Sequence, residues 1–507
     1  MSQPIQNITI AAPGFKGLNT EDSPVGLDPA FAAVAENTVI DKFGRIGARK
    51  GRNLLTASAT ILGSSLGIEA MIEHKDTAGV KTVFSAGNNL IFSGTTTLVD
   101  ETPAAYTITT NNWKMVNFNY HCYFFQRGYE PLVYSDHVGA VTAMTAHPHA
   151  TGVPPKGNEV LAAYGRLFVA DTDTNTSTVY WSDLLDGTAW TGGTSGSINL
   201  TNVWPEGFDE IVALAAHNGF LVIFGKRSIL VYSGASSPST MALSDTVSNI
   251  GCIARDSVQN TGTDLLFLSD TGVRSLGRTI QEKSLPVRDI SKNVRSDMMA
   301  LVSLQTSPIK SVYSPEEAFY LLTFPTSSTV YCFDMRTMLE DGSQRATLWT
   351  GTKLLSLLRI DNGDLLLGNL DGINTYDTYL DNTDTYQYRY FPTPMSFGDT
   401  SRLKILKEIR MTVIGGQSTV VTVNWGYDYS ENYQKQVLTI KGGSISEFGV
   451  AEFNGALVEF SGAVVDKKSV NPTGNGNVVS IGLEAVINTA PLSIQEMNIQ
   501  ALMGRIV

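Results

Sequence analysis

Short apolar segments, each followed by a polar turn and a second extended segment, repeat along most of the chain. Each pair predicts a β-hairpin, because β-branched and aromatic runs bounded by Gly, Asn, Asp and Ser are typical of short strands. The first segments are NLIFSG at 89, YFFQRG at 123, RLFVAD at 166, FLVIFG at 220, DLLFLS at 264, AFYLLTF at 318 and DLLLGN at 364. The second segments are TTLVD, LVYSD, TVYWSD, ILVYSG, GVRSLG, TVYCFD and INTYD.

The spacing of these hairpins, 34 to 54 residues, predicts a β-propeller in which each hairpin belongs to one blade. A single blade cannot bury its apolar faces alone, so neighbouring blades must stack around a common axis. Seven hairpins indicate seven blades, but the uneven spacing leaves six blades with one decorated loop as an alternative. Another all-β architecture, in which strands also recur at short intervals, is the competing interpretation.

The pattern changes after residues 381–399, where Pro392, Pro394 and Gly398 mark a domain boundary. Long alternating segments follow, from LKILKEIRMTVIG and STVVTVNWGYDY to the final IQEMNIQALMGRIV. Alternate residues of such strands face a core, and we expect Gly415 to Ser418 to form the turn between the first two. Residues 400–507 therefore predict a β-sandwich platform domain beside a propeller at residues 61–399.

Residues 1–60 differ from both parts and are expected to form an N-terminal arm or platform segment. Asp28 and Pro29 precede AFAAVAEN, which predicts a short helix. The following segment, FGRIGARKGRN, predicts a basic turn, which we interpret as a solvated hairpin rather than a docking arm. Its basic residues are Arg45, Arg49, Lys50 and Arg52.

Composition narrows the class of protein. A hydrophobic fraction of 42% with 17% charged residues is typical of a globular chain. The formal net charge of −12, without any basic run, disfavours stable binding to nucleic acid, although it suits a wall past which DNA slides. Cys122, Cys252 and Cys332 are expected to be reduced core residues, which indicates folding in a reducing cytosol. We expect no signal peptide, lipid anchor or transmembrane helix.

Two segments have the residue types of metal sites. His147 and His149 are the one close histidine pair in the sequence, but a metal site usually needs a third ligand, so we expect an interblade loop. Asp171, Asp173 and Asn175 begin like a calcium loop. Thr176 and Ser182 stand where such a loop needs Gly and an acid, so a polar hairpin loop is the favoured interpretation.

Enzyme signatures are weak. SDLLDGTAW at 182–190 approximates the Asp-box turn of sialidase propellers, which stabilises a blade and takes no part in catalysis. The sequence contains no G-x-S-x-G, H-E-x-x-H, phosphate-binding loop or dinucleotide fingerprint. We therefore expect a protein that is not an enzyme, without catalytic, cofactor-binding or metal-binding residues.

Three stretches resemble one family. GLNTEDSPVGLDPAFAAVAENTVIDKFGRIGARKG near the start, LSDTVSNIGCIARDSVQNTGTDLLFLSDTGVRSLGR in the middle and IQEMNIQALMGRIV at the end are similar to segments of the tail nozzle of short-tailed, podovirus-type bacteriophages. This family is also called tail tubular protein B or stabilisation protein. The motifs are degenerate and cover the two ends and the centre of the chain.

The resemblance implies a structural virion protein of the phage tail, assembled in the host cytoplasm as a homohexameric ring below the portal and its adaptor. Such a ring extends and closes the DNA channel, retains the genome before ejection and anchors tail fibres, tailspikes or a tail needle. Double-stranded DNA passes through the lumen without sequence specificity. The family offers no catalytic residues to transfer; the lumen and gating residues are not identifiable, and Gln417 or its turn is one weak candidate for a rim.

Two other functions stay open. A receptor-binding or glycan-degrading tail propeller would need exposed aromatic side chains beside a pair of carboxylates. Residues 375–391, TYDTYLDNTDTYQYRYF, keep this possibility open, although we favour a strand pair with tyrosines on both faces. A cytosolic interaction scaffold is less favoured, because the repeated Gly-His and Trp-Asp signatures of WD40 blades are missing.

Overall fold

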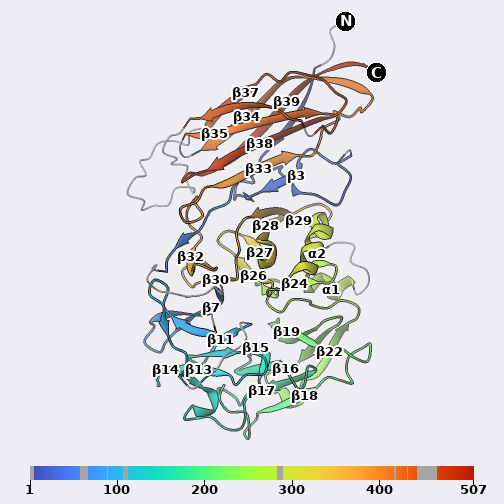
Figure 1. The fold of residues 1–507 in the computed structure, drawn as a ribbon. Helices are drawn as coiled ribbons and strands as arrows, with labels where there is room; N and C mark the ends of the chain where they lie inside the picture. The colour runs from blue at the N-terminus through green and yellow to red at the C-terminus, as the bar shows by residue number, and fades with distance from the viewer. Residues whose placement is uncertain are drawn as a thin grey trace.

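The computed structural model confirms a mainly β protein, with a seven-bladed propeller at one end and a β-sandwich at the other (Figure 1). The structure describes residues 5–24, 26–56, 67–87, 89–104, 106, 112–136, 138–282, 289–415, 418–430, 432–441 and 465–506. Gln417 lies outside these residues. Both chain ends lie at the sandwich end of the molecule (Figure 1).

The blades are small antiparallel sheets in sequence order. Blades 1 and 2 are β7 (Ile68–Lys75), β8 (Lys81–Gly87), β9 (Leu90–Ser93) and β10 (Val99–Asp100), then β11 (Lys114–Phe118), β12 (His121–Phe125), β13 (Leu132–Ser135) and β14 (Ala140–Ala143). Blades 3 and 4 are β15 (Gly157–Ala163), β16 (Arg166–Thr172), β17 (Thr178–Trp181) and β18 (Gly196–Asn199), then β19 (Ile211–His217), β20 (Phe220–Gly225), β21 (Ile229–Ser233) and β22 (Ala242–Val247). Each predicted hairpin therefore falls within one blade.

The last three blades depart from this pattern. Blade 5 has three strands, β23 (Gln259–Asn260), β24 (Leu265–Ser269) and β25 (Gly272–Ser275), and leads into the helices α1 (Leu276–Glu282) and α2 (Arg295–Leu304). Blade 6 is β26 (Lys310–Ser314), β27 (Phe319–Phe324), β28 (Thr329–Met338) and β29 (Gln344–Thr350). Blade 7 is β30 (Ser356–Arg359), β31 (Leu365–Gly368), β32 (Ile373–Thr375) and β6 (Asn53–Leu54). The ring is thus closed by a strand from the N-terminal segment.

Apolar side chains fill the seams between neighbouring blades. Phe84 of blade 1 meets Phe124 of blade 2 with ring centroids 5.6 Å apart, and Phe224 of blade 4 meets Phe267 of blade 5 at 5.0 Å. Ile68, Leu366 and Ile373 join blade 7 to blade 1. This arrangement gives each blade the burial that it lacks alone. Cys122, Cys252 and Cys332 are free and buried in this core, as predicted.

Two sheets form the sandwich. One contains β37 (Val465–Val470), β34 (Arg402–Gly415), β39 (Leu492–Ile506), β5 (Ile46–Ala48) and β4 (Thr38–Ile40), with β1 (Ile5–Ala11) paired to β39. The other contains β3 (Phe31–Glu36), β33 (Tyr386–Pro392), β38 (Val479–Ile487), β35 (Thr419–Tyr427) and β36 (Gln434–Ile440), with β2 (Gly17–Leu18) paired to β3. The N-terminal segment and β33 therefore contribute strands to the sandwich.

Two local predictions were wrong. AFAAVAEN forms strand β3 rather than a helix, because a place between β2 and β33 offers it backbone partners on both sides and buries Ala32 and Ala35. β34 and β35 are not a hairpin. β34 pairs with β37 and β39 in one sheet, while β35 pairs with β36 and β38 in the other, so the chain crosses between the sheets after Gly415.

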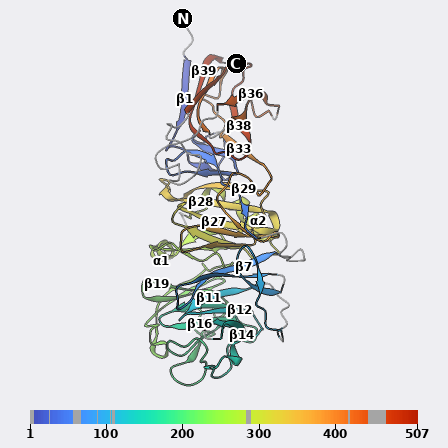
Figure 2. The ribbon, with the colours of Figure 1, turned by 90° about the vertical axis from the view of Figure 1, so that its left-hand side faces the viewer.

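Blade 6 and the sandwich share one sheet. β29, the outer strand of blade 6, pairs with β3 at Leu348 and Glu36, so a ten-stranded sheet runs from the propeller into the sandwich. A single apolar cluster, including Leu322, Phe333, Tyr388 and Ile499, extends through both parts. Figure 2 shows the sandwich in line with the propeller, at the end of an elongated molecule.

Candidate functional site at the propeller axis

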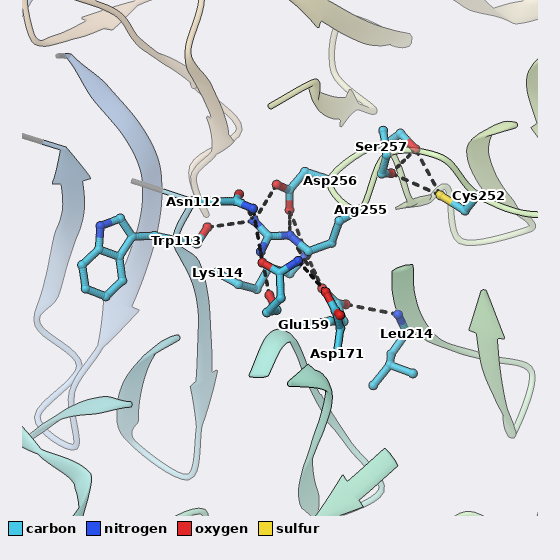
Figure 3. Close-up of polar contacts among 12 residues, drawn as sticks. Asn112, Trp113, Lys114, Glu159, Asp171, Leu214, Cys252, Arg255, Asp256 and Ser257 are labelled. Atoms are coloured by element: carbon cyan, nitrogen blue, oxygen red, sulfur yellow. Dashed lines mark hydrogen bonds and ion pairs between the residues drawn. The ribbon is translucent and has the colours of Figure 1, made fainter. Parts of the chain in front are cut away.

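Charged side chains from four blades meet at the axis of the propeller. Figure 3 shows those of blades 2, 3 and 5. Lys114 and Lys310 begin the innermost strands of blades 2 and 6, and Glu159 lies in the innermost strand of blade 3. Arg255 and Asp256 precede β23 of blade 5, where Asp256 makes an isolated bridge to Lys310. We call these five residues the axial network.

Arg255 is the centre of the axial network and is 6% exposed. Its guanidinium donates to the backbone and side-chain oxygens of Asn158, at 2.6 and 2.7 Å, and to the side-chain oxygen of Asn112 at 2.8 Å. It also pairs with both carboxylate oxygens of Asp256, at 3.1 and 2.8 Å. A planar guanidinium suits this set of fixed acceptors, because its donors point outward in one plane.

The ion pairs of the axial network cross the ring. Lys114 Nζ lies 3.2 Å from Asp256 Oδ1, and Lys310 Nζ lies 2.7 Å from Asp256 Oδ2. Blades 2 and 5 are three steps apart, the largest separation in a ring of seven. At this level the axis is therefore occupied by opposing side chains and leaves no passage for a DNA duplex.

Burial and neighbouring positive charges have opposite effects on the pKa values of the carboxyl groups in the axial network. Burial alone would raise the pKa of Asp256, but the charges of Arg255, Lys310 and Lys114 hold it well below its usual value. Burial raises the pKa of Glu159, although Lys114 and Arg255 oppose that shift. Glu159 also accepts the backbone N–H of Leu214 at 3.2 Å, which fixes it toward blade 4.

A polar cavity of about 420 Å³ lies over the network on one face of the propeller. Arg127, Asp171, Glu210 and Lys226 contribute to its lining. Arg127 pairs with Asp171 at 3.1 Å, and Lys226 pairs with Glu210. The charges of this cavity are thus matched within the protein: the Arg127–Asp171 pair joins blades 2 and 3, and the Lys226–Glu210 pair lies within blade 4.

The axial network was not identified from the sequence. The sequence signal is weak: an ionisable residue recurs near the start of several innermost strands, as in Lys114, Glu159 and Lys310. In the sequence, such residues cannot be distinguished from ordinary polar residues at the ends of strands. Only the closed ring places them together at one axis.

The histidine pair lies in the connection between blades 2 and 3, as predicted. The rings of His121 and His147 have centroids 5.3 Å apart, and those of His147 and His149 are 5.7 Å apart. Over the described part of the chain, no group of three or more His, Cys, Asp or Glu residues is arranged to hold a metal ion. No helix among the described residues is long and apolar enough to cross a membrane.

The calcium-like stretch is a polar turn between β16 and β17, as predicted, where Asn175 N–H donates to Thr172 Oγ1 at 3.0 Å. The turn that resembles an Asp box also has a structural role. Asp183 Oδ1 accepts the backbone N–H and the hydroxyl of Thr194, at 2.9 and 2.6 Å, and so holds the β17–β18 connection.

The basic turn is not a solvated hairpin. Arg45 and Arg49 are 3% and 2% exposed. Arg49 forms two hydrogen bonds to Asp381, at 2.9 and 2.7 Å, donates to Asn37 Oδ1 at 2.9 Å and lies 4.2 Å from the ring centroid of Tyr386. The turn lies at the junction of propeller and sandwich. Acidic and aromatic side chains there, such as Asp381 and Tyr386, compensate for the loss of water around the buried guanidinium of Arg49.

The tyrosine-rich stretch does not form an aromatic surface groove. Tyr386, Tyr388 and Tyr390 are buried on one face of β33, not on both faces, because the alternate residues of this strand face the sandwich core. The groove that would have favoured glycan binding is therefore not found at this stretch.

Comparison with known proteins gives no family. No protein-family model and no curated protein matches the chain. Among solved structures, the extracellular domain of the one-component system BT4673 from B. thetaiotaomicron is 11% identical with a TM-score of 0.42, over 65% of this chain and 40% of that one. YCF48 bound to D1 peptide is 11% identical with a TM-score of 0.36, over 62% of this chain and 93% of that one. Kluyveromyces lactis Hsv2 is 10% identical with a TM-score of 0.32, over 75% and 100%.

The chain thus spans less than half the length of the first of these structures. Similarities at such low TM-scores carry no argument about function. The propeller is defined by the pairing of the chain's own strands.

Proposed function

We propose that the chain is a structural subunit of a phage tail nozzle, in which six copies surround the path of the genome below the portal and adaptor rings. The proposal originates in the resemblance of the three sequence stretches. The observation that best supports it is the unequal division of charge between the two parts of the molecule.

The propeller carries most of the negative charge. Residues 51–380 contain 31 acidic and 21 basic side chains, whereas the remaining residues, 1–50 and 381–507, contain 17 and 15. Formal charges of −10 and −2 mean that copies repel one another mainly through their propellers and can approach through their sandwiches. A ring held at the sandwiches would present acidic propeller walls, which do not retain DNA phosphates.

The sandwich offers a surface for such contacts. Val420, Val437 and Val486 are 55%, 62% and 46% exposed on the neighbouring strands β35, β36 and β38. Exposed apolar side chains on the outer face of a sheet mark an interaction surface when they are contiguous. Stable interfaces between subunits are large and apolar at their centre, so these valines would form only the middle of the contact.

The closed propeller axis limits where DNA could pass. Because the axial network joins opposite blades, a duct must lie between copies rather than through each propeller. Tail fibres, tailspikes or a needle would then attach to the outside or the far end of the ring.

The test is the assembly state of the purified chain, measured by light scattering and negative-stain electron microscopy. We expect rings with about six times the subunit mass of 54.7 kDa and an open centre. The double variant Val420→Glu/Val486→Glu should be monomeric, whereas Val80→Glu, at a propeller position of 59% exposure, should still form rings. A wild-type chain that stays monomeric at micromolar concentration, or that cleaves host polysaccharide, would contradict the proposal.

A further inference from the structure

An apolar knob of three exposed side chains lies on turns of blades 2 and 3 of the propeller. It consists of Tyr120, in the turn between β11 and β12, and Leu184 and Leu185, in the connection after β17. Their exposed fractions are 58%, 52% and 61%. Blades 2 and 3, which carry these turns, lie farthest from the sandwich in Figure 1.

The three side chains are brought together by direct contacts between their turns. Asn119 Nδ2 donates to the backbone oxygen of Leu185 at 2.9 Å, which links the blade 2 turn to the blade 3 turn. A methyl group added at Gly165 would lie 3.1 Å from Leu184 Cδ1 and 3.6 Å from Leu185 Cδ2. The two leucines therefore lie over the β15–β16 turn, and the blade 2 turn that carries Tyr120 lies beside them.

The knob is rigid. Leu185 N–H donates to Gly165 O at 2.8 Å, and Leu184 N–H donates to Asp183 Oδ1 at 2.8 Å. Asp183 is itself fixed by Thr194, which also accepts a 2.7 Å hydrogen bond from the buried Arg166. Because hydrogen bonds within the protein already hold the loop in place, binding a partner would not involve the loss of conformational entropy that ordering the loop would require.

The backbone of the knob is also strained. Tyr120 and Leu185 both have φ of 59°, a left-handed conformation that bulky residues rarely adopt. Asn or Gly would relieve this strain and would remove an apolar side chain from water.

The charges around the knob select among possible occupants. Blades 1 to 4, residues 67–247, contain 16 acidic and 8 basic side chains. Asp183 and Asp186 flank the leucines, while beside Tyr120 the bases Lys75 and Lys81 are balanced by Glu73 and Asp361. A second copy of these acidic blades or an anionic membrane would be repelled, whereas an apolar surface flanked by basic residues would be attracted.

We propose that Tyr120, Leu184 and Leu185 form a docking site for a protein partner that presents an apolar surface flanked by Lys or Arg side chains. This inference does not depend on the proposed function. Its partner is defined by chemistry: the leucines supply the apolar contact, and the surrounding acids supply the attraction and the salt sensitivity.

The probe is a labelled amphipathic helical peptide of leucine and lysine, titrated with the full chain and followed by fluorescence anisotropy. The wild-type chain should bind it more weakly as salt rises, and Leu184→Ser/Leu185→Asn should bind at least about tenfold more weakly. The matched control is Leu304→Ser, which removes a leucine of 62% exposure from the end of α2 and should change the affinity less than about twofold. The general electrostatic attraction of the peptide to the acidic protein is the same in all three chains. A difference in affinity between the double variant and the other two chains therefore measures the contribution of the knob.

Tyr120→Ser gives an independent test, because it changes the other turn and should also weaken binding. Urea unfolding should show the double variant to be at least as stable as the wild type, since Asn tolerates left-handed φ. Equal affinity of the wild type and the double variant would overturn the proposal. So would equal binding of a leucine and glutamate peptide, or binding to phosphatidylcholine and phosphatidylglycerol vesicles that depends on the two leucines.

Discussion

At the scale of single residues, the strongest constraints in this protein come from charged side chains held away from water. Arg255, Asp256 and Glu159 at the axis and Arg49 at the domain junction are buried or nearly buried, and each is matched by an opposite charge or by fixed backbone groups. A buried pair adds little net stability, yet removing one partner leaves an uncompensated charge. These residues therefore specify which blades and strands come together.

Arg255→Leu should lower the free energy of unfolding by about 3 to 5 kcal/mol, because it leaves Asn112 and Asn158 without their charged donor and removes one of the three cations around Asp256. Urea unfolding measures the loss. Arg410→Leu is the control, since Arg410 is 55% exposed and forms a surface ion pair with Glu408, and it should change stability by less than about 0.5 kcal/mol. Equal effects of the two substitutions would show that the axial network is not a structural centre.

Glu69, on β7, should make stability depend on pH near neutrality. Burial raises its pKa from 4.5 to about 7, against the opposing charges of Lys310 and Lys353. Between these pH values the native chain binds more protons than the unfolded chain, so the free energy of unfolding falls as pH rises. Glu69→Gln should abolish the part of this decrease in the free energy of unfolding that is due to Glu69.

Melting temperatures at pH 4 and pH 8 test the role of Glu69. The Gln variant should match the wild type at pH 4 and exceed it at pH 8. The exposed Glu340→Gln should follow the wild type at both values. A wild-type curve that is parallel to that of Glu69→Gln over this range would refute the assignment.

At the scale of elements, backbone partners rather than intrinsic preference decide two segments. AFAAVAEN has the alanines of a helix but becomes the strand β3, because it lies between strands that need its hydrogen bonds. β6, only Asn53–Leu54, completes blade 7 by pairing with β32, so a distant N-terminal segment closes the ring. The path to β6 runs through Gly51, which has no room for a side chain.

Gly51→Ala should destabilise the ring closure. The added methyl group would lie 2.0 Å from Leu380 O, where backbone must move to admit it, and we expect a cost of about 1 to 3 kcal/mol. Gly26→Ala is the control, because nothing lies within 4 Å of the added group. Urea unfolding gives the loss, and hydrogen exchange should rise first in β32 and β6. Unchanged exchange in these strands would show that the closure does not depend on this approach.

At the scale of the whole molecule, the sheet shared by blade 6 and the sandwich makes the two parts a single mechanical unit. The apolar cluster that runs through both, and Arg49 between Asp381 and Tyr386, add to this connection. We therefore expect the propeller and the sandwich to move as one body, without a hinge at the domain boundary.

Calorimetry should therefore show one unfolding transition for propeller and sandwich together. Arg49→Leu should lower its midpoint without dividing it, because the shared sheet remains. Lys16→Met is the matched control: Lys16 pairs with Asp28 at 2.6 Å but is 36% exposed, and its loss should hardly move the midpoint. Two separate transitions in the wild-type chain would contradict a single unit.

The sequence alone determined the blades, because a hairpin is local: its apolar runs and glycine turns lie within about twenty residues of one another. The seven hairpins, the buried cysteines and the sandwich beyond residue 400 were all predictable from such patterns. Hydrophobic alternation also located β34, β35, β38 and β39, though not the sheet to which each belongs.

Only the tertiary structure decided what depends on distant partners. The strand β3, the closure by β6, the burial of Arg49 and the meeting of Lys114 with Asp256 each join segments far apart in the chain. No local signal marks a charged residue as buried, because the opposite charge that makes burial tolerable is chosen by the fold. The apolar knob is a further case: the sequence predicted a turn at Leu184 and Leu185, but only the structure shows that both side chains are exposed to water.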